Sequence, residues 1–114
     1  MIRICPSILN ADRNNLASEI LKIAKSSDFL HLDVMDNIFV PNKTFDLFES
    51  ERIIKECPIP VDTHLMIIDP EISVKKYCEF GSRSVTFHFE ATKNANLCIE
   101  NIRNSGARVG VAIK

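Results

Sequence analysis

The sequence LHLDVMD at residues 30–36 decides the fold of this chain, and the segment FVPN follows it at residues 39–42. Apolar residues alternate with His31 and Asp33. Because a strand places alternate side chains on the same face, both polar groups project to one side of a predicted strand. An imidazole and a carboxylate side by side on a rigid strand can hold a divalent metal, or place a base beside one.

A second histidine, His64, lies in the sequence VDTHLM at residues 61–66, which also has the pattern of a strand. If the two strands are neighbours, His31, Asp33 and His64 converge without distortion of the backbone. A structural interpretation stays open for each residue by itself, because a strand histidine is often a hydrogen-bonded polar residue, and Asp33 could cap the next element.

Length and composition predict one ordinary globular domain. The chain has 114 residues, of which 46% are hydrophobic and 25% charged, which argues against disorder. Its net charge of −1 carries no basic run, so nucleic acid and membrane surfaces are not expected partners. No apolar run is long enough to span a bilayer, and the N-terminus lacks a secretory pattern. We therefore expect a cytoplasmic protein.

The four cysteines, Cys5, Cys57, Cys78 and Cys98, are far apart and form no C-x-x-C pair. In a chain of cytosolic character, four reduced and mostly buried thiols are expected. A zinc ribbon or a disulfide framework is the weaker alternative.

Hydrophobic periodicity predicts strands and helices in strict alternation. The strands are expected at residues 2–9, 28–35, 60–67, 84–89 and 109–113. The helices are expected at residues 13–25, from about 47 to before Pro58, from Asp69-Pro70-Glu71 to Gly81, and at 94–104. Units of roughly 25 residues indicate right-handed βαβ crossovers and a parallel sheet. With three glycines and no Gly-x-Gly-x-x-Gly or Walker motif, a dinucleotide-binding fold is disfavoured.

Several runs together resemble the ribulose-phosphate 3-epimerase family, in its order and at its spacing. They are PSIL (6–9), HLDVMD (31–36), FVPN (39–42), HLM (64–66), TFHFEA (86–91) and GVAIK (110–114). The resemblance covers the N-terminal half of the family's TIM (β/α)8 barrel. It implies that residues 1–114 form an incomplete barrel of about five parallel strands and four helices.

The resemblance also implies an activity, the interconversion of D-ribulose 5-phosphate and D-xylulose 5-phosphate in the pentose phosphate pathway. A metal would stabilise an enediolate while one carboxylate removes the C3 proton and a second returns a proton from the other face. Two histidines and carboxylates suit Zn, Fe(II), Mn or Co equally. The expected partners are a sugar phosphate and further copies of the chain in a homo-oligomer.

By the same resemblance, His31, Asp33 and His64 are metal ligands, and Asp33 is also a catalytic acid–base group. Ser7 and His64 would contact the substrate, and Met35 and Met66 would line the site, although core packing is an equal interpretation for the methionines. His88 and Glu90 share a strand face and could support the site from behind the ligands, or serve only packing or the surface. The long loop at residues 36–46 is a candidate lid.

Three departures from the family pattern affect the interpretation. Asn37 and Asp46 stand where glycines are usual, although Asn tolerates positive φ better than most residues. The chain also ends after the fifth expected strand, whereas the barrel needs eight strands in about 200 residues. The second catalytic Asp and the phosphate-binding loops would lie in the absent part. Unpaired edges should then favour dimerisation, aggregation or a partly molten state.

Two alternative functions remain. The chain could be a catalytically inactive half-barrel that binds metal or a partner chain, or it could belong to a hexulose-phosphate 3-epimerase paralogue. Related decarboxylase and aldolase barrels carry an Asp-x-Lys-x-x-Asp pattern, whereas this strand reads Asp33-Val34-Met35-Asp36 without lysine.

Overall fold

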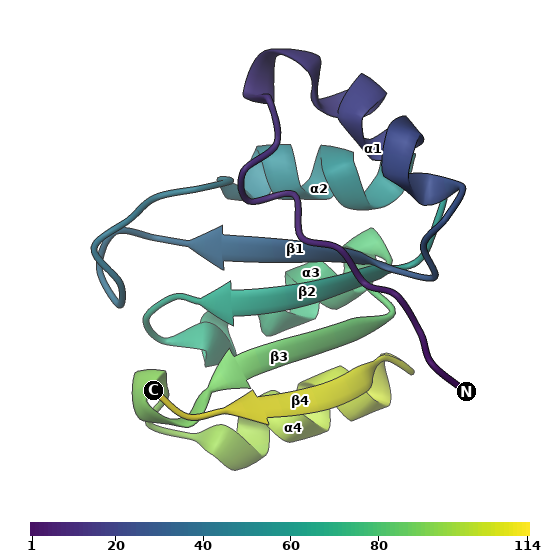
Figure 1. Cartoon of the computed structure of the whole chain (residues 1–114). Coiled ribbons are helices and arrows are strands. Elements are labelled where there is room, and N and C mark those ends of the chain that lie inside the picture. Colours follow the sequence, from purple (N-terminus) through teal and green to yellow (C-terminus); the bar gives the residue numbers. More distant parts are fainter.

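The computed structural model describes residues 1–114 as a four-stranded parallel sheet with the strand order β1-β2-β3-β4 (Figure 1). The strands are β1 (Leu30–Met35), β2 (Val61–Met66), β3 (Ser84–His88) and β4 (Arg108–Ala112). The helices are α1 (Leu16–Ala24), α2 (Leu47–Glu56), α3 (Val74–Phe80) and α4 (Ala95–Asn104). Consecutive strands are neighbours with a helix in each connection, so the predicted βα alternation and incomplete barrel are confirmed. No helix has the length and apolar character needed to cross a membrane.

The first expected strand, at residues 2–9, is wrong as a regular strand. The segment does run beside β1, where Ser7 forms an isolated parallel bridge with His31. The His31 amide donates to the Pro6 carbonyl at 2.8 Å, and the Ile8 amide donates to the His31 carbonyl at 3.3 Å. The next ladder bond towards the N-terminus would need a donor at Pro6, which has no N–H. One ladder bond is therefore missing at Pro6, although the Ile4 carbonyl still accepts from the Phe29 amide at 3.2 Å. The segment is not a regular strand, and four strands are found instead of five.

The helix-facing side of the sheet holds the hydrophobic core. Leu30, Leu32 and Leu65 are fully buried, as are Val85 and Phe87. Each such side chain contributes roughly 1.5–3 kcal/mol when it leaves water. Figure 1 shows α3 and α4 behind the sheet, and the N-terminal segment crossing in front of it. The period-two alternation therefore sends the polar residues of each strand to the opposite, inner face.

Strand register arranges the inner face in rows. One row runs across the four strands as His31, Asp62, Ser84 and Arg108. The next row runs as Asp33, His64, Thr86 and Gly110. Met35 and Met66 are register partners one step further along, at the ends of β1 and β2. This register brings the polar residues of separate strands side by side.

The ends of the helices differ from the predicted boundaries in two places. The segment expected to begin a helix at Arg13 starts with a 3-10 turn at Arg13–Asn15, where the Asp12 carboxylate caps the Asn14 amide, and α1 follows. Asp69 has a left-handed backbone with φ 49° and no side-chain cap, and a second 3-10 turn at Pro70–Ile72 precedes α3. The sequence signals at both places mark a helical start without separating the two kinds of helix.

The backbone accommodates Asn37 and Asp46, which stand where the family usually has glycine. Asn37 adopts φ 60°, as its side chain permits. Asp46 has extended backbone and begins α2 with a capping box, in which its carboxylate accepts from the Glu49 amide at 2.7 Å. Gly81 ends α3 with φ 111°, as predicted. The chain therefore keeps its turns without glycine at Asn37 and Asp46.

Gly110 fixes how closely β4 approaches β3. A Cβ at this position would lie 2.1 Å from the Thr86 hydroxyl oxygen. We expect Gly110→Ala to destabilise the chain by about 1–3 kcal/mol, because the overlap forces a backbone or rotamer shift. Urea unfolding of Gly110→Ala, Thr86→Ala and the double variant measures the coupling. Strict additivity of the two substitutions would contradict the predicted contact.

Candidate active site and metal centre

The carboxylate of Asp33 is the shared acceptor of the inner face. The Ser7 hydroxyl donates to its Oδ2 at 2.6 Å. Its Oδ1 lies 3.1 Å from His31 Nε2 and 3.3 Å from His64 Nδ1. Only 11% of the Asp33 side chain is exposed, so these partners replace most of its water. Three segments of the chain therefore converge on one carboxylate.

The predicted convergence of His31, Asp33 and His64 is confirmed as geometry. One nitrogen of each histidine and one oxygen of Asp33 all lie within 4.8 Å of one another. Two imidazole nitrogens and a carboxylate oxygen fit a borderline transition metal such as Zn²⁺ or Fe(II). A small shift of side chains would place all three around one ion, and further ligands would have to come from elsewhere.

The second nitrogen of His31 is held from behind by Asp62. His31 Nδ1 lies 2.8 Å from Asp62 Oδ2, and Ser84 Oγ donates to the other oxygen of that carboxylate. An ionised carboxylate accepts only, so Nδ1 carries a proton. With Nδ1–H directed at Asp62, the neutral ring presents the lone pair of Nε2 towards Asp33. Metal-ligating histidines commonly donate their other ring N–H to a carboxylate, so His31 has the orientation that such a ligand would need.

His64 has a comparable partner in His88. Their Nε2 atoms are 2.8 Å apart, and the two rings stack with centroids 5.0 Å apart. The Phe39 ring covers His88 at a centroid distance of 5.2 Å. His88 Nδ1 is buried without a hydrogen-bond partner, and its nearest acidic oxygen belongs to Glu90, at 3.8 Å. If His64 donates from Nε2, its Nδ1 is free to face Asp33 as a ligand.

Proximity of opposite charges sets the protonation of this cluster. Hydrogen bonds to Asp33 and Asp62 raise the pKa of His31 to about 10. Burial alone would raise the pKa of Asp33, but hydrogen bonds from the two histidines and Ser7 together hold it well below its usual range. The His31 hydrogen bond likewise lowers the pKa of Asp62. In the metal-free chain, an imidazolium therefore lies between two carboxylates, and a metal ion has to displace a proton.

The loop at residues 36–46 is ordered by hydrogen bonds to its ends. Asp36 Oδ1 accepts from the Ile38 and Phe39 amides, and Oδ2 accepts from the Ile68 amide. Thr44 Oγ1 donates to the Asp33 carbonyl at 2.6 Å and accepts from the Met35 amide. Asp36 therefore has a structural task in this loop, and Thr44 fixes the backbone around Asp33.

Asp62 and Ser84 were missed as site residues from the sequence. The signal for Asp62 was present, because it lies two residues before His64 and thus on the same strand face. Ser84 gave no such signal, since its role depends on the pairing of β2 with β3. Ser7, Met35 and Met66 lie on the predicted inner face, but their contact with substrate remains a prediction.

The fold and this cluster define a class of protein. Consecutive βα units with polar chemistry on the inner face are typical of TIM-barrel enzymes, and this chain forms part of such a barrel. The sequence profile of the ribulose-phosphate 3 epimerase family matches residues 3–114, and the chain belongs to that family.

Individual relatives agree with the family match. The chain is 44% identical over 111 residues to the ribulose-phosphate 3-epimerase of Mycobacterium leprae. The aligned region is 97% of this chain and 49% of that protein. It is 35% identical over 114 residues to the ribulose-phosphate 3-epimerase of Bacillus subtilis, and that aligned region is 99% of this chain and 52% of the relative. The chain therefore spans about half the length of the curated relatives it matches.

The His31 environment predicts a pH-dependent stability in the metal-free chain. A raised pKa in the folded state stabilises the fold fully below the ordinary value of 6.5, and this contribution is lost as pH rises through about 10. We expect the free energy of unfolding to decline over that window by more than in His31→Gln, which cannot gain a proton. Chelator-treated samples unfolded in urea at several pH values measure the difference. Parallel pH profiles for the two proteins would contradict the assigned environment.

Proposed function

We propose that this chain is the N-terminal portion of a metal-dependent epimerase that interconverts D-ribulose 5-phosphate and D-xylulose 5-phosphate in the cytoplasm. The observation that carries the proposal is the convergence of His31, Asp33 and His64 on the inner face, in a chain of this family. These three residues would hold one divalent ion, with Zn, Fe(II), Mn and Co all compatible with the donor set. When bound, the ion would supply Lewis-acid polarisation of a carbonyl oxygen.

Asp33 is the proposed acid–base group of this half of the site. Its low pKa keeps the carboxylate ionised at neutral pH, the state in which it could take a proton, while the hydrogen-bond donors that lower the pKa in the metal-free chain also weaken it as a base. The Ser7 hydroxyl donates to Asp33 Oδ2 in the free chain, and it would donate to a substrate oxygen when substrate is bound. Met35 and Met66, which are register partners at the ends of β1 and β2, would form an apolar floor beside the reacting carbons.

Epimerisation also needs a second acid–base group, which returns a proton to the face of the carbon opposite Asp33. Asp62 is a poor candidate, because it projects from the same inner face as Asp33 and would approach the substrate from the same side. We therefore propose that the second carboxylate and the phosphate site come from outside residues 1–114, either in a longer polypeptide or in another copy within a homo-oligomer. An inactive half-barrel that still binds metal, and a hexulose-phosphate substrate, remain the alternative proposals.

Metal binding is the first test of this site. We expect Asp33→Asn to weaken Mn²⁺ binding at least tenfold, because the substitution removes the only anionic ligand of the His31/Asp33/His64 group. Isothermal titration calorimetry of chelator-treated chain measures the affinity. Asp69→Asn is a matched control, since Asp69 lies outside the cluster and Asn tolerates its left-handed backbone. Equal weakening by both variants, or by neither, would contradict the proposed ligand set.

Turnover of ribulose 5-phosphate by the purified, metal-loaded chain separates the functional alternatives. Activity that is lost in Asp33→Asn would mean that another copy supplies the complementary group. A folded chain that binds metal without turnover would favour the half-barrel alternative. Turnover on a hexulose phosphate alone would replace the substrate assignment.

A further inference from the structure

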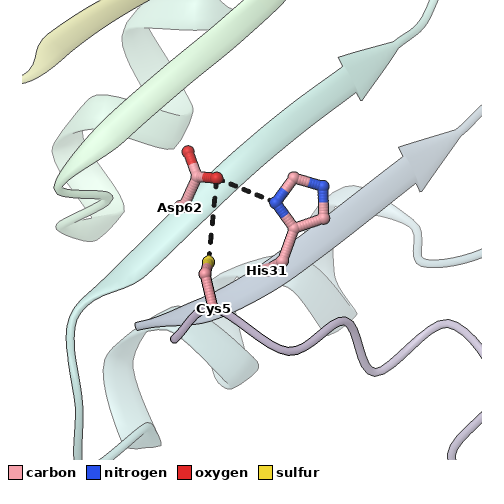
Figure 2. Close-up of side chains that lie close together, drawn as sticks. All are labelled: Cys5, His31 and Asp62. Carbon is pink, nitrogen blue, oxygen red and sulfur yellow. Dashed lines mark hydrogen bonds and ion pairs between the residues drawn. The ribbon is translucent and has the colours of Figure 1, made fainter. Parts of the chain in front are cut away.

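A second group of metal-ligating side chains lies on the other side of the His31 ring. Figure 2 shows Cys5 from the N-terminal segment, His31 from β1 and Asp62 from β2 directed towards one another. Their ligand atoms all lie within 4.8 Å of one another. Asp62 Oδ2 is 2.8 Å from His31 Nδ1 and 4.0 Å from Cys5 Sγ. The proposed function makes no use of the Cys5 thiol.

The donor spacing is close to that of a tetrahedral metal site. Bonds of about 2.3 Å to sulfur and about 2.0 Å to nitrogen and oxygen place S and O about 3.5 Å apart, and N and O about 3.3 Å apart. The observed separations of 4.0 Å and 2.8 Å differ from these by about 0.5 Å each, within reach of small rotamer shifts. A thiolate and a carboxylate would also balance the two charges of the ion.

The group of Cys5, His31 and Asp62 is open to solvent and has space for an ion. Cys5 is exposed, contrary to the expectation that the thiols are mostly buried, while Cys98 is fully buried. A pocket of about 310 Å³ adjoins the group and is lined by Cys5, Asp62, Ser84 and Thr86 among others. An ion can therefore reach the three side chains from solvent, and a water molecule can complete its coordination.

We propose that Cys5, Asp62 and His31 Nδ1 form a second metal site, which takes a thiophilic divalent ion such as Cd²⁺ or Zn²⁺ and excludes an ion from the His31/Asp33/His64 site. Binding releases the Cys5 thiol proton and the Nδ1 proton of His31 to solvent. The remaining proton stays on Nε2, where Asp33 Oδ1 already lies at 3.1 Å as an acceptor. His31 then has no lone pair for the other site, and this exclusion rests on the proposed function.

The presence of the site is tested by titrating the full chain with Cd²⁺ and following the ultraviolet charge-transfer absorption of a cadmium–thiolate bond. We expect one saturable band in the wild type and in Asp33→Asn, and its loss in both Cys5→Ala and Cys5→Ser. Cys57→Ala is the matched control and keeps the band, because Cys57 belongs to no ligand group. A band that persists without Cys5, or that disappears in Asp33→Asn, would overturn the proposal, as would its absence from the wild type.

Stoichiometry tests the exclusion separately. Calorimetry should give one Cd²⁺ per wild-type chain, with the band, and one per Cys5→Ala chain, without it. Two ions per wild-type chain would overturn the exclusion. A wild-type chain that shows the band beside a folded Cys5→Ala chain that binds no Cd²⁺ would keep the Cys5 site and contradict the proposed function instead.

Discussion

The parallel register of β1 and β2 is the constraint on which the inner face depends. It pairs Asp33 with His64 directly and places His31 two residues away on the same face. A one-residue slip would send these side chains into the apolar, helix-facing core. The buried residues Leu30, Leu32 and Leu65 hold the register, because each would otherwise face solvent. The hydrophobic core on one side of the sheet therefore positions the polar cluster on the other.

Burying the Asp33 carboxylate would destabilise the fold if its hydrogen-bond donors were absent. Asp33 is largely buried, and a buried carboxylate that loses its donors costs several kcal/mol. Ser7 and the two histidines offset this cost in the metal-free chain, and they leave the carboxylate ionised. Each histidine also has a partner behind it, Asp62 or His88, on the neighbouring strand. The rings are therefore held in place before any ion arrives, which limits the reorganisation that binding requires.

Features of the fold and site that depend on residues close together in the sequence could be predicted, and those that depend on pairing between distant segments could not. Alternation within residues 30–36 was sufficient to place His31 and Asp33 on one face, and the same period placed His64. The expected strand at residues 2–9 failed because Pro6 removes a ladder donor, an effect that appears only once its pairing partner is known. The contact of Cys5 with Asp62 joins residues far apart in the sequence, and no periodicity could indicate it.

Asp62 and His88, the partners behind the two histidines, decide which ring nitrogen of His31 and of His64 faces Asp33. Long-range ¹H–¹⁵N NMR of the imidazole rings reads this directly in Zn²⁺-loaded Cys5→Ala chain, where the thiolate of the alternative site is absent. We predict a proton on Nδ1 of His31 and on Nε2 of His64, with the resonance of the other nitrogen of each ring shifted by the metal. A His31 ring protonated at Nε2, or two rings unaffected by zinc, would contradict it.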